Sequence, residues 1–366
     1  MGERLRILLS NTNLREQPRG LGFYALQLGA ALARRDDTSV AFLAPVNAPP
    51  GAQWVRMPRM RHERRLLWEA VHIRRLAREL GSDVCHGVYF TVPLFTRMPR
   101  VATVHDLIWK HFPENAAWRG GRRQDVMAHI ALRADRIIVP TAHTRREFLE
   151  FFSYPEDRIR VVAEAPRAGQ APVAAERVAE TLARLGVERP YFLCAGVSAV
   201  HKRGVDAVRA LGALRAGGLQ AQLVFTGHPG AMHQPMEREA RRLGVTDRVR
   251  YAGYVDDADL DALYTGSVAL LYPSLYEGFG LPPFEAMACG TPVVSAHTPP
   301  MDEILEGAAV FVPGRDPAAI AREAARLLRE PGWRDECVAR GFEHVRRFSW
   351  DRAAAETMEV YDEARR

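Results

Sequence analysis

The run from Glu277 to Glu285, EGFGLPPFE, contains the residues best suited to chemistry in this chain. A strand is predicted just before it, over residues 268–272, and a helix over residues 284–289, whose first turn tolerates prolines. Glycines permit a positive φ and a close approach of the backbone, so N–H groups of this turn can face a ligand. Two carboxylates eight positions apart would then reach different parts of one ligand. The alternative, an ordinary loop with a capping acid, explains a single glutamate better than the whole run.

A second group of candidates, His201, Lys202 and Arg203, follows a strand predicted over residues 191–195 and the turn residue Gly196. Three cationic or potentially cationic side chains after a strand suit the binding of a diphosphate. A lysine supplies a compact charge, and an arginine supplies a bidentate fork. A basic turn on the surface is the alternative, which we consider the weaker interpretation.

The segment of residues 20–25, GLGFYA, fits the GxGxxA pattern of dinucleotide-binding proteins, but we reject that interpretation. Its glycines lie about ten residues beyond the strand predicted over residues 5–10, whereas the fingerprint needs a tight strand-to-helix turn. Gly20 and Gly22 still open a predicted helix, whose free N–H groups could bind a phosphate. A simple capping turn is the alternative.

His105 and Asp106 follow a strand predicted over residues 101–104. They therefore lie at the carboxyl end of a strand, where α/β proteins bind ligands. A single histidine is more often structural than catalytic, but this position gives the two interpretations equal weight. Gly227 lies in another glycine turn at a strand end, and alone it is a weak signal.

The composition is that of a soluble or peripheral protein. The chain has 366 residues, enough for two domains with full cores, and a formal net charge of +6. Its four cysteines are far apart and lack metal-ligand spacing, so we expect reduced, largely buried thiols in a cytoplasmic protein. We find no apolar stretch long enough to span a bilayer.

Positive charge is concentrated in the first half of the chain. Residues 1–170 contain 27 Lys/Arg and 17 Asp/Glu, a net charge of +10, whereas residues 171–366 carry −4. The excess is densest over residues 56–78, where arginines surround apolar residues in the pattern of a basic amphipathic helix. Such a helix could meet an anionic surface. A solvated face on a helix packed against a sheet is slightly favoured for this helix alone, although the asymmetry of the whole half favours an anionic partner.

Strands and helices alternate in both halves, which predicts an α/β protein with two parallel, doubly wound, Rossmann-like sheets. Strands are predicted over residues 5–10, 40–43, 84–86, 101–104, 137–139 and 159–162, then over 191–195, 223–226, 249–251, 268–272, 292–295 and 309–312. Helices are predicted over residues 21–34, 64–80, 119–133 and 144–152, then over 205–215, 232–243, 258–265, 284–289, 318–328 and 350–366. Residues 163–175 lack apolar periodicity and are the best linker candidate. Two such sheets imply a cleft into which the strand ends of both domains point.

With these residues in place, the chain resembles the retaining glycosyltransferases of family 4, which have the GT-B fold, over nearly its full length. The resemblance is strongest in residues 249–255 (VRYAGYV), 273–276 (PSLY), 277–285 and 285–294 (EAMACGTPVV). Supporting motifs are residues 103–107 (TVHDL), 134–139 (ADRIIV) and 348–350 (FSW).

The resemblance implies a nucleoside diphosphate sugar held mainly by the C-terminal domain. By this carry-over, Glu285 binds the ribose hydroxyls, and Glu277 faces the transferred sugar and its phosphate. Lys202 neutralises the diphosphate, Gly20 approaches it from the other domain, and His105 contacts the donor sugar. Of these residues, Glu277, Lys202 and His105 are expected to be catalytic. Further donor-binding residues expected on this basis are Gly22, Gly196, His201, Arg203, Gly227, Tyr254, Gly278, Phe279, Gly280 and Leu281.

One departure from the family pattern affects the expected diphosphate site. Val200-His201-Lys202 stands where relatives often have Pro-Arg-Lys, so a permanent cation is replaced by a histidine that titrates near neutral pH. Arg203, commonly Asn or Gly in relatives, could compensate. The sequence leaves open whether His201 or Arg203 replaces the usual arginine.

We therefore predict an N-terminal, acceptor-side Rossmann-like domain over residues 1–165 and a C-terminal nucleotide-sugar-binding domain over residues 166–349. The resemblance implies that the helix over residues 350–366 crosses back to the N-terminal domain. The run of residues 256–259, DDAD, is expected to cap a helix and not to bind metal, since no Asp-x-Asp motif lies near a strand end.

The predicted activity is metal-independent, retaining transfer of a hexose, without a cofactor, from a donor of the GDP-mannose or UDP-glucose type to an acceptor hydroxyl. The acceptor is expected to be lipid-linked or a growing glycan of envelope polysaccharide or glycolipid assembly. The protein would be cytoplasmic, with peripheral binding at the inner face of the membrane left open. Nucleic acid is not expected as a partner, because aromatic residues do not interleave the basic ones. Three alternatives remain: the protein is a GT-B nucleotide-sugar epimerase, it glycosylates a soluble small molecule, or it is a non-catalytic binding protein. The sequence does not identify the base and sugar of the donor, the acceptor, the linkage or the oligomeric state.

Overall fold

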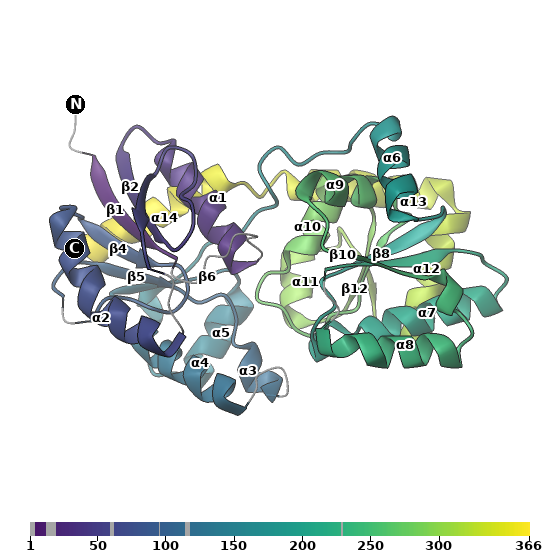
Figure 1. Cartoon of the computed structure of the whole chain (residues 1–366), viewed down its shortest axis with the longest axis horizontal. Coiled ribbons are helices and arrows are strands. Elements are labelled where there is room, and N and C mark those ends of the chain that lie inside the picture. Colours follow the sequence, from purple (N-terminus) through teal and green to yellow (C-terminus); the bar gives the residue numbers. More distant parts are fainter. Residues whose placement is uncertain (1–3, 12–19, 59–61, 95, 114–117, 228–229) are drawn as a thin grey trace. The chain divides into compact units, whose positions relative to one another are not determined.

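The protein is described here by a computed structural model, which covers residues 4–11, 20–58, 62–94, 96–113, 118–227 and 230–366. The chain forms two compact units (Figure 1). The first unit comprises Met1–Ala168 together with Phe348–Arg366, and the second comprises Gly169–Arg347.

The described part of the first unit contains a seven-stranded parallel sheet in the order β3-β2-β1-β4-β5-β6-β7. Its strands are β1 (Leu5–Ser10), β2 (Thr38–Ala44), β3 (Gln53–Arg56), β4 (Val84–Gly87), β5 (Arg100–Thr103), β6 (Arg136–Val139) and β7 (Ile159–Val161). Its helices are α1 (Leu21–Ala33), α2 (His62–Glu79), α3 (Ile108–His111), α4 (Trp118–Ala131), α5 (Ala142–Phe151) and α14 (Trp350–Arg365).

Helices cover both faces of this sheet, and the strands are therefore short apolar runs. Along β1, Ile7 and Leu9 pack in a core with residues of α1 and α14. Leu8, which points to the opposite face, packs in a different core with Ile73 and Ala77 of α2. The apolar character of both faces explains why the sequence shows these strands clearly.

Helix α14 belongs to the first unit although it follows the second unit in the sequence. It packs against α1 and lies close to β5 and β6. Its first residue, Trp350, donates from Nε1 to the carbonyl oxygen of Pro166 (2.9 Å). Near its end, Glu363 forms ion pairs with Arg136 and Arg160. Both ends of the helix are thus attached to the first unit.

Within its described residues, the second unit contains a six-stranded parallel sheet in the order β10-β9-β8-β11-β12-β13. Its strands are β8 (Tyr191–Ala195), β9 (Gln222–Thr226), β10 (Val249–Gly253), β11 (Leu270–Tyr272), β12 (Val293–Ala296) and β13 (Val310–Val312). Its helices are α6 (Ala175–Leu185), α7 (Gly204–Ala216), α8 (His233–Arg242), α9 (Asp257–Gly266), α10 (Leu281–Ala288), α11 (Pro299–Leu305), α12 (Pro317–Arg329) and α13 (Pro331–Val345).

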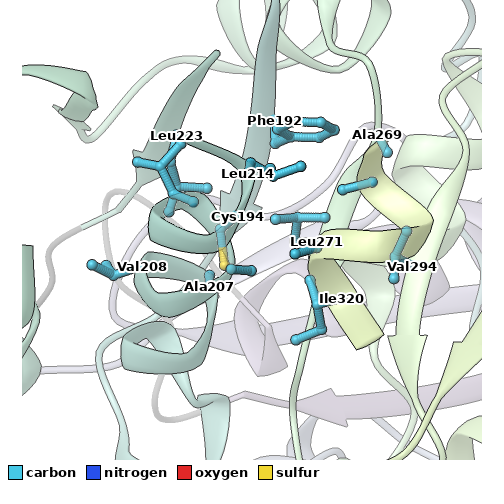
Figure 2. Close-up of a cluster of buried hydrophobic side chains, with 14 of the residues drawn as sticks. Phe192, Cys194, Ala207, Val208, Leu214, Leu223, Ala269, Leu271, Val294 and Ile320 are labelled. Carbon is cyan, nitrogen blue, oxygen red and sulfur yellow. The ribbon is translucent and has the colours of Figure 1, made fainter. Parts of the chain in front are cut away.

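One face of this sheet packs on α7 and α12 (Figure 2). Phe192 and Cys194 of β8 and Leu223 of β9 contribute from the sheet, and Leu214 and Ile320 contribute from the two helices. Tyr191 and Leu193, which alternate with Phe192 and Cys194, point to the opposite face. There the Tyr191 hydroxyl donates to the carbonyl oxygen of Leu263 in α9 (2.8 Å).

The predicted fold class is confirmed: both units are doubly wound parallel α/β structures. The edge strand β3 and the helices α3, α6, α11 and α13 were not predicted, and α10 begins at Leu281 instead of residue 284. The expected capping run is confirmed, because the side chain of Asp256 accepts a hydrogen bond from the backbone N–H of Asp259 (2.8 Å). All four cysteines are free and buried, as expected.

Candidate functional site

In the second unit, the candidate residues gather where the strand order reverses. The chain passes from β8 outward through β9 and β10 and then returns to β11 on the other side of β8. The loops that follow β8 and β11 therefore leave the sheet in opposite directions from neighbouring strands. Open α/β sheets bind ligands at the carboxyl ends of the strands beside such a point.

The loop after β8 begins at Gly196 and leads to Lys202. Gly196 has a φ of 71°, and a Cβ atom placed on it would meet nothing within 4 Å. The loop closes in a 3₁₀ turn, Val200–Lys202, just before α7. The positive φ and the open space at Gly196 leave room for a ligand against the backbone.

Lys202 pairs with Glu277 of the loop after β11. The distance between Lys202 Nζ and Glu277 Oε1 is 2.5 Å, and both side chains are largely buried. Burial would raise the pKa of Glu277, but the charges of Lys202 and His201 and the hydrogen bonds from Lys202 and Ser274 hold it below its usual value. Glu277 is therefore ionised at neutral pH, with two cationic or potentially cationic side chains close to it.

The turn between Glu277 and Glu285 is built on a core aromatic pair. The ring of Phe279 stacks on that of Phe284 at 4.7 Å between centroids, and both side chains are buried. Gly280 is the N-cap residue of α10 and has a φ of 87°, which glycine adopts without strain. The buried pair fixes this turn, so any contact of Phe279 with a ligand would be made by its backbone and not by its side chain.

Glu285 lies on α10 and is half-buried. Its Oε2 accepts a hydrogen bond from the hydroxyl of the buried Tyr264, at 2.8 Å. Burial and the charge of Glu277 raise the pKa of Tyr272 well above its usual value, and the charge of Glu285 adds to this shift. The charges of Glu277 and Glu285 therefore both raise the pKa of Tyr272, at the end of β11. The structure thus brings the two carboxylates into one neighbourhood.

Arg203 has a carboxylate partner that the sequence analysis did not identify. Its Nε and Nη2 donate to the two carboxylate oxygens of Asp206, at 2.7 and 2.9 Å. Asp206 is buried in the first turn of α7, so the arginine fork already has a bidentate partner. His201 is buried as well, and its charge contributes to the lowered pKa of Glu277.

Gly227 and Tyr254 lie at the ends of β9 and β10, on the same edge of the sheet. Gly227 has a φ of 83°, and its N–H donates to the carbonyl oxygen of Gly253 (2.6 Å). Tyr254 is 39 % exposed. Gly278 is buried in the turn after β11, and Leu281 is the first residue of α10.

In the first unit, Gly20 and Gly22 open α1. Gly20 is the N-cap residue with a φ of 46°, and a Cβ atom there would meet nothing within 4 Å. Gly22 is buried in the first turn. β1 ends at Ser10, so the spacing on which the rejection of the dinucleotide fingerprint rests is confirmed.

His105 is buried just beyond β5, and both of its ring nitrogens have partners. Nδ1 lies 2.9 Å from Oε1 of the buried Glu164, and Nε2 lies 2.9 Å from the carbonyl oxygen of Val88. Two acceptors facing one imidazole require an N–H on each nitrogen or a proton on Glu164. A hydrogen bond from His105 to a ligand would have to replace one of these two.

A buried polar network connects α14 with the surroundings of His105. His86 lies 2.8 Å from the hydroxyl of Tyr361 and 2.7 Å from Oγ1 of Thr103. Thr103 in turn lies 3.2 Å from the hydroxyl of Tyr24, whose ring contacts the His105 ring edge to face at 4.5 Å. Burial and the charge of His105 lower the pKa of His86 to about 3, so His86 is neutral.

Three residues that contact the candidate residues were not singled out from the sequence: Tyr264 beside Glu285 in the second unit, and Glu164 and Tyr24 beside His105 in the first. Glu164 follows β7 closely, and its place at a strand end was the available signal. Tyr264 lies inside a helix and Tyr24 near the start of one. No pattern in the sequence indicates that they contact Glu285 and His105.

The described residues contain no cluster of three or more His, Cys, Asp or Glu side chains that could hold a metal ion. None of the helices formed by these residues is long and apolar enough to cross a membrane.

Two family models match the chain: "Glycosyl transferases group 1" over residues 183–344 and "Glycosyltransferase Family 4" over residues 18–164. An O-antigen chain mannosyltransferase B of Escherichia coli is 29 % identical over 312 residues, 83 % of this chain and 78 % of that protein. A D-inositol 3-phosphate glycosyltransferase of Xylanimonas cellulosilytica is 30 % identical over 417 aligned positions, 99 % of this chain and 97 % of that protein. Among solved structures, a sucrose-phosphate synthase of Thermosynechococcus elongatus has a TM-score of 0.79 and 22 % identity, with 98 % of each chain covered.

Proposed function

Because the chain belongs to the group 1 glycosyltransferases of family 4 and has their GT-B fold, we propose that it transfers a hexose from a nucleoside diphosphate sugar to an acceptor hydroxyl with retention at the anomeric carbon. The observation that carries this proposal is the Lys202–Glu277 pair beside the Gly280 turn, at the point where the strand order of the second unit reverses. A cation, a carboxylate and backbone N–H groups at one strand edge suit a sugar linked to a diphosphate.

Lys202 would stabilise the departing diphosphate. Cleavage of the anomeric C–O bond leaves negative charge on the leaving group, and a preorganised cation lowers the energy of that transition state. His201 is the better candidate for the second cation, because the Arg203 fork is already bound to Asp206. The residues of this site would then stabilise the leaving group without a metal ion.

Glu277 would orient the sugar. Its Oε1 is held by Lys202, and its pKa lies below the usual value, so it is a fixed acceptor for sugar hydroxyls and not a proton donor. We propose that the acceptor oxygen attacks from the face that the diphosphate leaves, with a phosphate oxygen taking the proton. Transfer with retention then needs no protein nucleophile, and the protein contributes orientation.

Glu285 would bind the ribose hydroxyls from α10. Gly20 and His105 of the first unit remain proposed donor-binding residues. The E. coli relative is named a mannosyltransferase, which supports a donor of the GDP-mannose type. A UDP-glucose type donor is the second candidate.

Thermal unfolding with a panel of UDP and GDP sugars tests the proposed donor, because a bound ligand raises the unfolding temperature. We expect one donor class to stabilise the wild type and not Glu285→Ala, and a lack of stabilisation by the whole panel would contradict the donor site.

The acceptor would be lipid-linked or part of an envelope glycan. Residues 1–170 carry a net charge of +10, more than the few cations that can reach a donor diphosphate. Arg74, Arg75 and Arg78 are exposed on α2, which is the predicted basic helix. We propose that this helix meets the anionic cytoplasmic face of a membrane, where each arginine would contribute about 1 kcal/mol.

A further inference from the structure

Tyr264 has the geometry of a residue that controls Glu285. It lies near the end of α9, is fully buried, and donates from its hydroxyl to Glu285 Oε2 at 2.8 Å. Glu285 is half-buried on α10, and the hydroxyl of Tyr264 reaches its carboxylate from the protein interior.

The backbone of Tyr264 is fixed to the same neighbourhood. Its carbonyl oxygen accepts hydrogen bonds from Oγ of Ser267 (2.9 Å) and from Oγ1 of Thr291. Thr291 lies just beyond the end of α10, and its N–H donates to the carbonyl oxygen of Ala286 in that helix (2.9 Å). Tyr264 is thus bound at its hydroxyl and at its carbonyl to the segment that bears Glu285.

The direction of the Tyr264–Glu285 hydrogen bond is also fixed. Burial raises the pKa of Tyr264 well above its usual value, and the charge of Glu285 raises it further, so the hydroxyl stays protonated. A carboxylate has about four acceptor positions, of which the tyrosine uses one on Oε2. A carboxylate of fixed orientation can accept hydrogen bonds from two neighbouring hydroxyl groups, such as those of a ribose.

We infer that Tyr264 is a positioning residue for donor recognition, which holds the Glu285 carboxylate in the one orientation that accepts both ribose hydroxyls. This inference rests on the proposed function, which assigns the ribose to Glu285. A glutamate side chain has several rotatable bonds, and fixing it before binding removes an entropic cost from the binding step. Loss of the tyrosine hydroxyl would remove the hydrogen bond to Oε2 and increase the share of this ordering that falls to the ligand.

The test compares ribose with dideoxyribose. UDP, GDP and the 2′,3′-dideoxy form of each are titrated into wild type and Tyr264→Phe, and the ratio of dideoxy to ribo Kd is measured for the nucleotide that binds more tightly. Tyr191→Phe is the matched control, because Tyr191 is also buried in this unit but donates to the carbonyl oxygen of Leu263.

In wild type we expect the ribo form to bind at least about tenfold more tightly, from the hydrogen bonds to a charged group. Tyr264→Phe should reduce this ratio by about three- to tenfold and leave the dideoxy Kd unchanged. Tyr191→Phe should keep the wild-type ratio. In turnover assays, Tyr264→Phe should raise the KM for the donor sugar by a similar factor with little change in kcat.

The outcomes separate the two claims. An unchanged ratio in Tyr264→Phe overturns the positioning role and leaves the proposed function intact. A wild type that does not distinguish ribo from dideoxy nucleotide overturns both the positioning role and the assignment of Glu285. If Tyr264→Phe does not fold, Glu285→Asp replaces it, because the shorter side chain withdraws the carboxylate from the tyrosine. A ratio of dideoxy to ribo Kd in Glu285→Asp that equals the wild-type ratio then overturns the inference.

Discussion

Lys202 Nζ lies 2.5 Å from Glu277 Oε1, although the two residues are 75 positions apart in the chain. They meet because β8 and β11 are neighbours in the sheet while β9 and β10 lie on the far side of β8. The pair gives each residue a second role. Lys202 keeps Glu277 ionised. Glu277 in turn holds the largely buried ammonium group of Lys202 in place at the strand ends.

Replacement of the lysine tests its part in catalysis. Lys202→Ala should lower kcat by about 10²–10³-fold with a much smaller change in donor KM, because leaving-group charge is greatest in the transition state. Steady-state kinetics with the true donor measures both constants. Lys110→Ala is the control. Lys110 is the other lysine of the chain and lies in the first unit, so this variant should retain the wild-type kcat. Equal kcat values for wild type and Lys202→Ala would remove the lysine from the mechanism.

The Glu277 carboxylate should affect stability in a pH-dependent way. Its pKa in the folded protein lies below the usual value, so its stabilising contribution is complete above the unfolded pKa of about 4.3 and is lost as pH falls through the folded pKa. Glu277→Gln should therefore lower the free energy of unfolding by about 1–3 kcal/mol at pH 7, where Lys202 is left unpaired. The difference from wild type should shrink below about pH 4.

Urea denaturation at pH 7 and at lower pH measures this difference. Glu336→Gln is the control, since Glu336 is exposed on α13 and its loss should change little at any pH. A gap between wild type and Glu277→Gln that stays constant with pH would show that the ion pair does not stabilise the folded state.

Much of the fold was predictable because buried parallel strands are apolar on both faces. β1 and β8 were predicted with the bounds that the structure gives them. β3 was missed because it is an edge strand whose residues are largely exposed, so burial left no apolar pattern. Helices α11 and α13 were also missed. They open with Pro299-Pro300 and Pro331-Gly332, residues that weaken a helical pattern in the sequence although proline suits a first helical turn.

The candidate site was predictable in its residue types and not in its pairings. Glu277, Lys202 and Glu285 stand out because a strand end, glycines and charges coincide in the sequence. Which cation meets which carboxylate depends on the order of strands in the sheet, and that order is a long-range property. The bidentate Arg203–Asp206 pair is local, with a spacing of three residues, and could have been anticipated from Asp206 in the first turn of α7.

His201 should make the activity depend on pH. If its imidazolium replaces a permanent cation, wild-type kcat should fall as pH rises and the imidazolium loses its proton. His201→Arg should keep its kcat over the same pH series, because a guanidinium does not lose its proton. A pH–kcat profile at saturating donor measures this, and identical profiles for the two proteins would contradict a role for the imidazolium charge.

Charge reversal on α2 tests the membrane proposal. Co-sedimentation with vesicles containing anionic lipid should be strong at low salt, should weaken as salt rises, and should fall in Arg74→Glu/Arg75→Glu. Adding Arg64→Glu and Arg65→Glu, whose side chains lie outside the described residues, should reduce it further. Arg322→Glu/Arg329→Glu on α12 reverses two exposed charges of the second unit and serves as the control. A wild type that stays in the supernatant at low salt would point to a soluble acceptor.

The stereochemistry of transfer tests the central claim most directly. Nucleotide-sugar donor and acceptor are incubated with the enzyme, nucleoside diphosphate release is followed with and without acceptor, and the anomeric configuration of the product is read by NMR. The account predicts acceptor-dependent release and a product with the anomeric configuration of the donor, both largely lost in Lys202→Ala. An inverted product, or an epimerised nucleotide sugar formed without acceptor, would contradict it.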